Sequence, residues 1–137
     1  MLKCPHLTQP QNKSRCTYTA LFALVTQLYC AVTWAQDFYQ GLEIAAIART
    51  REVVRYDGAY LKIPFPMGDV PANIGVCTDV IIRSYRTMGV DLQTLVHQDM
   101  RENFDAYPSR KIWGMRAPDT NIDHRRVPNL QTYFARH

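Results

Sequence analysis

The sequence predicts a single small domain that is built mostly from α-helices and loops. Apolar residues recur at helical spacing in several segments, a stretch rich in proline and glycine (residues 56–76) interrupts them, and no long alternation of apolar and polar residues indicates a strand. With 137 residues, of which 47% are hydrophobic and 20% charged, the chain is too short for two typical domains and too apolar to be wholly disordered.

Residues 1–35 have the features of an export signal. Lys3, Lys13 and Arg15 precede an uncharged apolar run at residues 18–32, which ends in the short segment Thr33-Trp34-Ala35. This order of basic, apolar and small residues is typical of a signal peptide and predicts an exported, periplasmic protein that starts at residue 36. The alternative is an uncleaved signal anchor, because the run could almost span a bilayer.

The positive charge of the chain belongs largely to this leader. The whole sequence has 16 Lys and Arg against 12 Asp and Glu, and the three basic residues of the leader leave 13 against 12 for residues 36–137. A net charge of +1 does not indicate a nucleic-acid interface. The leader also contains Cys4, Cys16 and Cys30, so cleavage would leave Cys77 as a lone thiol that cannot form an intrachain disulfide.

The first two predicted helices flank the proline-rich stretch. An apolar stripe predicts a helix from Phe38 to about Val54, whereas the prolines and glycines of residues 56–76 predict an ordered, mostly extended loop. A second helix is predicted over residues 77–88, with Val80 and Ile81 on its apolar face and a glycine, Gly89, in the position of a C-terminal cap.

Two more helices are predicted in the second half of the chain. Asp91 is suited to cap the start of a helix that runs to about Phe104. Residues 109–124 are predicted to be loop. Pro128 fits the first turn of a short helix over residues 127–134, since proline is tolerated there.

Cys77 is the candidate catalytic residue. A thiol at a helix N-terminus faces unpaired backbone N–H groups and the positive end of the helix dipole, which favour the nucleophilic thiolate. Gly75 would let a substrate approach the backbone, whereas the carboxylate of Asp79 disfavours a nearby thiolate. The alternative is a small, buried cysteine that packs in the first turn of the helix.

A cysteine nucleophile also needs a general base, which is usually histidine. Residues 36–137 contain His97 within a predicted helix, His124 beside an acidic residue in a predicted loop, and His137 as the last residue. None of them stands in a pattern that identifies it as the partner of Cys77.

The segment from Asp119 to Asp123 resembles the start of a calcium-binding loop, because Asp119, Asn121 and Asp123 follow the D-x-N-x-D pattern. His124 replaces the required turn glycine, and Leu130 replaces the chelating glutamate. We therefore predict no metal and no cofactor, and expect these side chains to form turn and capping hydrogen bonds.

The neighbouring Arg125 and Arg126 allow two interpretations. They could bind a carboxylate or phosphate of a ligand, or they could form structural ion pairs with nearby aspartates. The remaining candidates for lining the site around Cys77 are Asp69, Asp79, Asp123, His124 and Arg125.

Several segments together resemble the YijF-like family of exported bacterial domains of unknown function. They are Tyr56-Asp57, Tyr60, residues 66–71, 75–83 and 90–93, Asp99-Met100, Tyr107-Pro108 and residues 119–130. The family is similar, more distantly, to the NlpC-type branch of the papain-like cysteine peptidases and amidases. The resemblance implies an α+β parent fold in which a helix starting at the nucleophile packs on an antiparallel sheet, and it assigns Cys77 to the nucleophile position.

The chain departs from this family in one respect. Members continue beyond the segment that matches Leu130, through strands that include a His-Ile-Gly type motif, whereas here the sequence stops at His137. The expected histidine and sheet have no counterpart. We therefore expect a C-terminally truncated chain, with residues 36–137 as the N-terminal part of a YijF-like domain that is helical and loop-rich.

The resulting functional expectation is an exported thiol hydrolase acting on peptide or amide bonds of the cell envelope, and inactive as this chain stands. Its expected partners are cell-wall peptide or an envelope protein, without nucleic acid, and with a membrane only through an uncleaved leader. Two alternatives remain. One is a non-catalytic envelope module that binds ligands through residues 56–76 and Arg125-Arg126, and the other is a poorly folding remnant of a longer domain.

Overall fold

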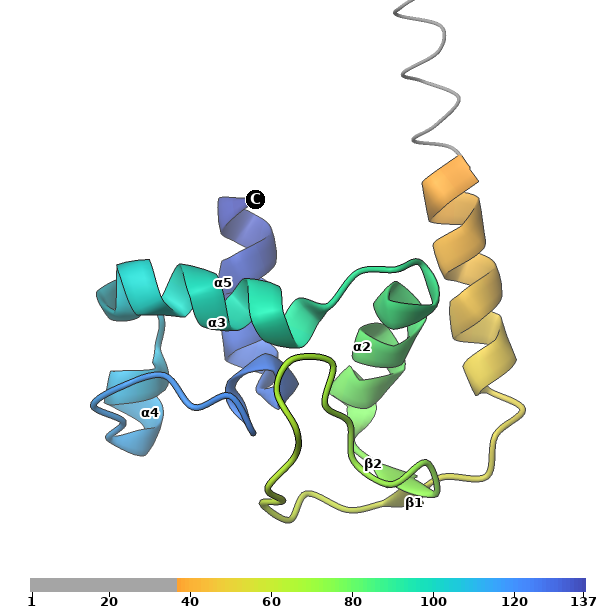
Figure 1. Ribbon diagram of the computed structural model, residues 1–137, viewed down its shortest axis with the longest axis horizontal. Helices are drawn as coiled ribbons and strands as arrows, with labels where there is room; N and C mark the ends of the chain where they lie inside the picture. Colours follow the sequence, from red (N-terminus) through yellow and green to blue (C-terminus); the bar gives the residue numbers. More distant parts are fainter. Residues whose placement is uncertain (1–36) are drawn as a thin grey trace, which may run out of the picture. The chain divides into compact units, whose positions relative to one another are not determined.

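The computed structural model describes residues 37–137, so the predicted leader lies outside the described residues. Residues 38–137 form one compact unit. Residues 37–49 are helical, and the elements that follow are shown in Figure 1. They are β1 (Arg55–Tyr56), β2 (Ile74–Gly75), α2 (Cys77–Thr87), α3 (Leu92–Asn103), the 3-10 turn η1 (Phe104–Ala106), α4 (Ser109–Trp113), the 3-10 turn η2 (Asp123–Arg125) and α5 (Val127–Arg136). None of the helices within this described part is long and apolar enough to cross a bilayer.

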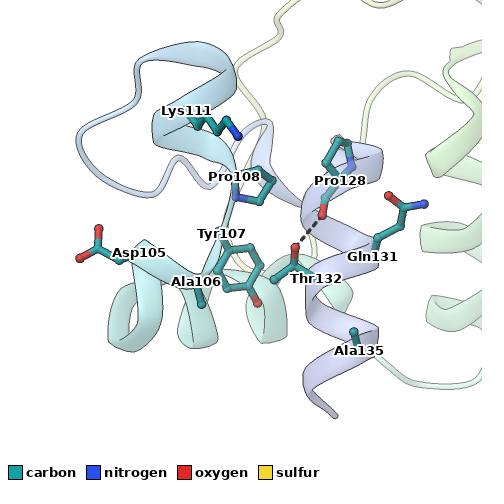
Figure 2. Close-up of a pocket in the computed structure, with 9 residues that line it drawn as sticks. All are labelled: Asp105, Ala106, Tyr107, Pro108, Lys111, Pro128, Gln131, Thr132 and Ala135. Carbon is teal, nitrogen blue, oxygen red and sulfur yellow. Dashed lines mark hydrogen bonds between the residues drawn. The ribbon is translucent and has the colours of Figure 1, made fainter.

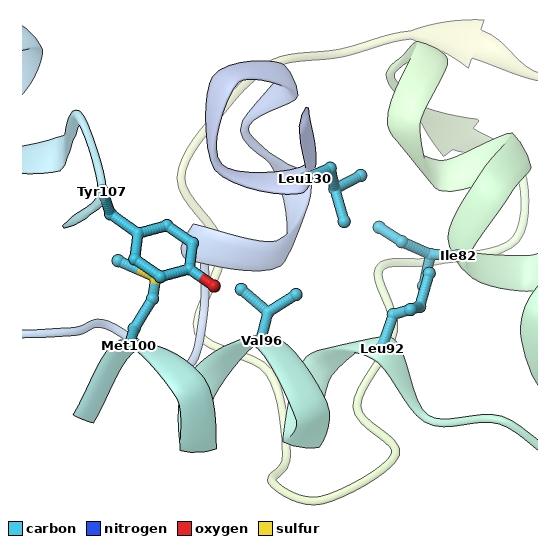
Figure 3. Close-up of a cluster of buried hydrophobic side chains, with 6 residues drawn as sticks. All are labelled: Ile82, Leu92, Val96, Met100, Tyr107 and Leu130. Carbon is cyan, nitrogen blue, oxygen red and sulfur yellow. The ribbon is translucent and has the colours of Figure 1, made fainter. Parts of the chain in front are cut away.

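The core lies where α2, α3 and α5 meet. Figure 3 shows Leu92, Val96 and Met100 in a row along α3, with Ile82 of α2 and Leu130 of α5 pointing towards them. Tyr107 completes the cluster. The spacing of the three α3 residues is that of a single helical face, as the sequence predicts. This small core fixes α2, and therefore Cys77 at its start, relative to α5.

The connection from α2 to α3 has the predicted caps. Gly89 has a φ of 78°, which favours glycine, and its N–H donates to the carbonyl of Arg86. The Asp91 side chain accepts a hydrogen bond from the N–H of Gln93 at 3.1 Å, and its other oxygen accepts one from the N–H of Met67 at 3.0 Å. Asp91 therefore caps α3 and also holds the loop of residues 56–76.

We expect Asp91→Ala to lower the free energy of unfolding by about 1–2 kcal/mol, at the upper end for a helix cap because the contact with Met67 is lost as well. Urea unfolding followed by circular dichroism measures this change. Asp91→Asn keeps an acceptor oxygen and serves as the matched control. Equal destabilisation by the two variants would contradict the capping role.

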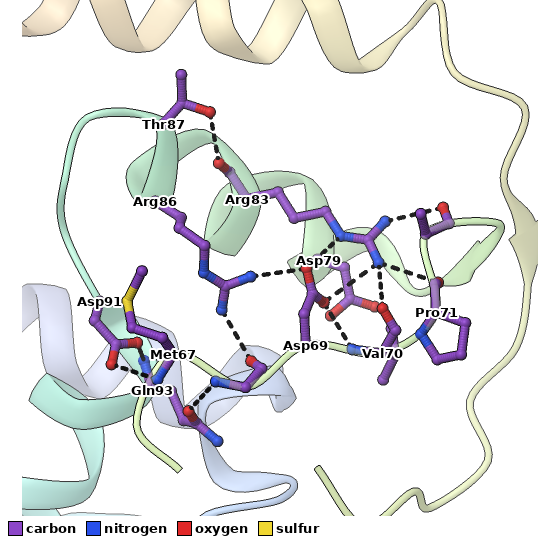
Figure 4. A network of polar contacts seen from close by, with 12 residues as sticks. Met67, Asp69, Val70, Pro71, Asp79, Arg83, Arg86, Thr87, Asp91 and Gln93 are labelled. Carbon is purple, nitrogen blue, oxygen red and sulfur yellow. Dashed lines mark hydrogen bonds and ion pairs between the residues drawn. The ribbon is translucent and has the colours of Figure 1, made fainter. Parts of the chain in front are cut away.

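The loop of residues 56–76 is held by side chains of α2, as Figure 4 shows. Arg83 donates to Asp69 at 3.0 Å and to the carbonyl oxygens of Val70 and Pro71 at 3.2 and 3.3 Å. Arg86 donates to the same carboxylate at 2.7 Å and to the carbonyl oxygen of Gly68 at 2.9 Å. The loop also contributes β2, which pairs in parallel with β1. The prediction that no helix runs through this segment is thus confirmed.

The predicted secondary structure is wrong in two places. Residues 109–124 are not all loop, because they contain α4 and the start of η2. Gly114, with a φ of 65°, ends α4, and Ser109 is anchored to Asn129 of α5 at 3.1 Å. The first helix ends at residue 49, and a turn at residues 50–52 and two irregular residues lead into β1.

The buried face of α2 also differs from the prediction. Val80 and Ile81 are 44% and 40% exposed, whereas the buried residues of the helix are Thr78, Asp79, Ile82, Arg83 and Ser84. Polar side chains occupy the interior because Asp79 and Arg83 find charged partners there. The apolar residues Val80 and Ile81 therefore face outward, and Ile81 lies next to α5.

Candidate functional site

Cys77 is the first residue of α2, and its side chain is exposed. The preceding residue, Val76, has an extended backbone, so the helix begins at the thiol as the sequence predicts. The alternative of a buried cysteine that packs in the first turn is therefore wrong.

The start of α2 leaves backbone donors free at the thiol. The N–H of Val76 donates to the Asp79 carboxylate at 2.6 Å, and the N–H of Asp79 donates to the carbonyl of Val76 at 3.0 Å. The N–H groups of Cys77 and Thr78 have no acceptor among residues 37–137. This is the pattern of a helix N-terminus, whose first donors lack intrahelical partners.

Gly75 makes this arrangement possible. A Cβ atom at this position would lie 2.9 Å from Oδ2 of Asp79, which is closer than such atoms come in proteins. The glycine therefore lets the Asp79 carboxylate reach back to the backbone of Val76.

A buried ion pair ties the start of α2 to η2. Nε and one Nη of Arg125 each donate to a carboxylate oxygen of Asp79 at 2.9 Å, and the two side chains are 3% and 4% exposed. The Thr78 hydroxyl donates to the carbonyl oxygen of Arg125 at 2.7 Å. Because Arg125 forms an ion pair with Asp79, the electrostatic repulsion expected between this carboxylate and a Cys77 thiolate is weaker.

The other predicted site residues have different partners. Asp69 binds Arg83 and Arg86 farther along α2. Asp123 is buried and accepts a hydrogen bond from the N–H of Asp119 at 2.5 Å, and burial raises the pKa of its carboxyl group. The structure thus brings Asp79 and Arg125 to the base of the helix that carries Cys77, and uses Asp69 and Asp123 to hold neighbouring loops.

The three histidines have different surroundings, and His124 lies in η2 next to the residue that pairs with Asp79. His124 is 2% exposed, and burial, assisted by Arg125, lowers its pKa to about 4. His97 packs edge-on against Phe65, and His137 stacks on Tyr133 at the end of α5. Within residues 37–137 no side chain forms a hydrogen bond with the Cys77 sulfur.

The segment from Asp119 to Asp123 is a hydrogen-bonded turn. The Asp119 carboxylate accepts hydrogen bonds from the N–H of Asn121 at 2.8 Å and from the Tyr60 hydroxyl at 3.0 Å. In the described part of the chain, no group of three or more His, Cys, Asp or Glu side chains is placed to hold a metal ion. The predicted turn and capping role is confirmed.

Both arginines that could clamp an anion are already paired. Arg125 binds Asp79, and Arg126 binds Asp123 at 3.2 Å while its guanidinium stacks 4.1 Å from the ring centre of Trp113. Of the two interpretations of Arg125-Arg126, the structure shows the ion pairs.

An apolar groove of about 250 Å³ lies beside Cys77. It lies between α2 and α5 and is lined by Cys77, Thr78, Ile81, Val127, Leu130, Gln131 and Phe134. We call it the Cys77 groove. The groove was not predicted from the sequence, although apolar residues of α2 outside its buried face are a signal for such a surface.

A second, more open cavity of about 570 Å³ lies between η1, α4 and α5. Figure 2 shows Tyr107 and Pro108 on one side of it and Thr132 and Ala135 of α5 on the other. Cys77 does not line this cavity, so the cavity is not a candidate binding site for a substrate of the thiol.

Comparison with known proteins identifies the family. Residues 44–137 match the family model described as "Domain of unknown function (DUF1287)". The chain is 57% identical over 82 residues to the uncharacterized protein YijF of Escherichia coli (strain K12). This match covers 60% of the chain but only 39% of the relative, and no solved structure matches. The chain therefore belongs to the DUF1287 family.

Proposed function

We propose that this chain carries the nucleophile of an exported, papain-like thiol hydrolase that acts on peptide or amide bonds of the cell envelope. The observation that supports the proposal most is the exposed Cys77 thiol at the first position of α2, next to backbone N–H groups without acceptors among residues 37–137. Nucleophile and oxyanion donors lie together at a helix N-terminus in such enzymes.

The proposed reaction begins with the Cys77 thiolate. Its sulfur attacks the carbonyl carbon of the substrate, a C–S bond forms, and the carbonyl electron pair moves to the oxygen, which accepts hydrogen bonds from the N–H groups of Cys77 and Thr78. Collapse of this intermediate breaks the C–N bond, and the leaving amine takes a proton. Water then hydrolyses the thioester. The buried pair of Asp79 and Arg125 holds the helix end in position throughout.

Two proton transfers in this reaction need a general base and a general acid. His97 packs on Phe65 and His137 on Tyr133, whereas His124 is buried in η2 beside Arg125, and burial keeps it neutral above about pH 4. We propose that the missing group, together with the sheet of the α+β parent fold, belongs to a part of the domain outside residues 37–137. The length of YijF supports this, since the matched segment is 39% of that protein. Residues 37–137 alone are then inactive in turnover.

Export is part of the same proposal. The basic and apolar pattern of residues 1–35 supports it, and a periplasmic location would bring the thiol to peptide and amide bonds of the envelope.

Acylation of Cys77 tests the proposal. The chain is incubated with an activated thioester, and the acylated cysteines are identified by proteolysis and mass spectrometry, in buffer and in urea. We expect Cys77 to be acylated about tenfold faster in the folded chain than in the unfolded chain, because the helix N-terminus stabilises the oxyanion. Cys77→Ser is the control for the assignment of the adduct. Slower acylation in the folded chain would refute the proposal.

A further inference from the structure

We propose that the Cys77 groove binds one uncharged, apolar side chain of the substrate, adjacent to the carbonyl that the thiol attacks. This inference rests on the proposed function and specifies its substrate class: peptides or acyl donors with an aliphatic or aromatic residue at the bond that reacts.

The position of the groove connects it with the reaction. Cys77 and Thr78 form one end of it, and they are the same residues that supply the nucleophile and the free N–H donors. A carbonyl carbon at the Cys77 sulfur therefore has its substituent at the mouth of the groove. Val127 and Phe134 of α5 form the opposite wall.

The chemistry of the groove selects its occupant. Apart from the Cys77 thiolate itself, none of its lining residues carries a charge, and only Thr78 and Gln131 have polar side chains. Ile81, Val127 and Phe134 are each between 40% and 44% exposed, so an apolar occupant would remove their surface from water. A carboxylate or ammonium group would lose its hydration in the groove without gaining a charged partner.

The size of the groove limits the occupant to one side chain. Its volume of about 250 Å³ is smaller than the ~300–1,000 Å³ typical of sites for drug-sized ligands. The larger cavity near Tyr107 is bordered by the charged residues Asp105 and Lys111, and Cys77 does not line it. It therefore has neither an uncharged lining nor contact with the thiol.

Alkylation kinetics test this inference without requiring turnover. Iodoacetamide, N-benzyl iodoacetamide and iodoacetate each alkylate the Cys77 thiolate: an S–C bond forms to the methylene carbon, the C–I bond breaks, and iodide leaves. Rates at Cys77 are measured by mass spectrometry on the full chain and divided by the rates for N-acetylcysteine. We expect the normalised rate of N-benzyl iodoacetamide to be about tenfold higher than that of iodoacetamide, as for a pocket that fits an apolar group. The normalised rate of iodoacetate should be lower than that of iodoacetamide.

A single charge in the groove should abolish this preference. Gln131 is exposed, so Gln131→Glu places a carboxylate at the groove with little effect on folding, and we expect it to lower the benzyl preference by about tenfold. Gln98→Glu makes the same change on α3, away from the groove, and should leave the ratio unchanged.

The outcomes separate this inference from the proposed function. A normalised ratio near unity, or equal effects of Gln131→Glu and Gln98→Glu, overturns the apolar site, whereas rapid acylation of folded Cys77 would still support the nucleophile. Slow acylation of folded Cys77 refutes the proposed function itself. If Cys77 becomes protected as the chain dimerises in sedimentation velocity, a second copy occupies the groove and the inference is wrong.

Discussion

We expect Arg125→Ala to lower the free energy of unfolding by about 3–5 kcal/mol, the largest effect of any single substitution considered for this protein. The variant leaves the Asp79 carboxylate buried without its guanidinium partner, and an uncompensated buried charge is strongly destabilising. Urea unfolding followed by circular dichroism measures the change. The same variant should slow the acylation of Cys77, because the start of α2 loses its anchor to η2.

Two controls show whether burial causes the effect. Arg110 pairs with Asp105 on the surface, with side chains 63% and 82% exposed, so Arg110→Ala should cost about 1 kcal/mol or less. In the double variant Asp79→Leu/Arg125→Met both charges are removed, and most of the lost stability should return. Equal costs for Arg125→Ala and Arg110→Ala would contradict the structural role of the buried pair.

The second large effect is a loss of stability in mild acid that originates at His124. Burial, followed by the nearby charge of Arg125, lowers its pKa from the ordinary value of 6.5 to about 4. Between these two values the unfolded chain binds a proton at this residue and the folded chain does not. Stability is therefore fully present above pH 6.5 and falls as the pH drops towards 4, by about 3 kcal/mol.

His124→Gln isolates this contribution. The wild-type pH profile also contains His97, whose pKa burial lowers as well, and Asp123, whose raised pKa acts in the opposite direction. The pKa of Asp99 lies well below its usual range because of the Arg136 guanidinium, so that carboxyl contributes only at lower pH. We expect the two unfolding free energies, measured by urea titration at each pH, to converge as the pH falls. Parallel profiles would contradict a neutral, buried His124.

The helix boundaries that could be predicted are those encoded by local residues. Asp91 caps α3, and Pro128 lies in the first turn of α5. Gly89 follows the end of α2 and adopts the positive φ that favours glycine. The helix α4 was missed because its five residues are held by a tertiary contact, from Ser109 to Asn129, and short helices have little stability of their own.

The candidate site was only partly predictable for a similar reason. The position of Cys77 at the start of a helix follows from the sequence around Gly75, and the structure shows this position. The partner of Asp79 lies 46 residues away in Arg125, so the sequence indicated a repulsive carboxylate where the structure has a neutralised pair. The Cys77 groove lies between α2 and α5. The local sequence does not show which exposed apolar residues of two distant helices lie next to each other.

The time course of p-nitrophenyl acetate cleavage shows whether Cys77 is a usable nucleophile that lacks its general base. The chain with Cys4, Cys16 and Cys30 replaced by serine retains Cys77 as its sole cysteine. We predict a burst that corresponds to a single acetyl group per chain, followed by a rate no faster than that of the variant that also carries Cys77→Ser. Sustained turnover that depends on Cys77, or the absence of any burst, would contradict the account.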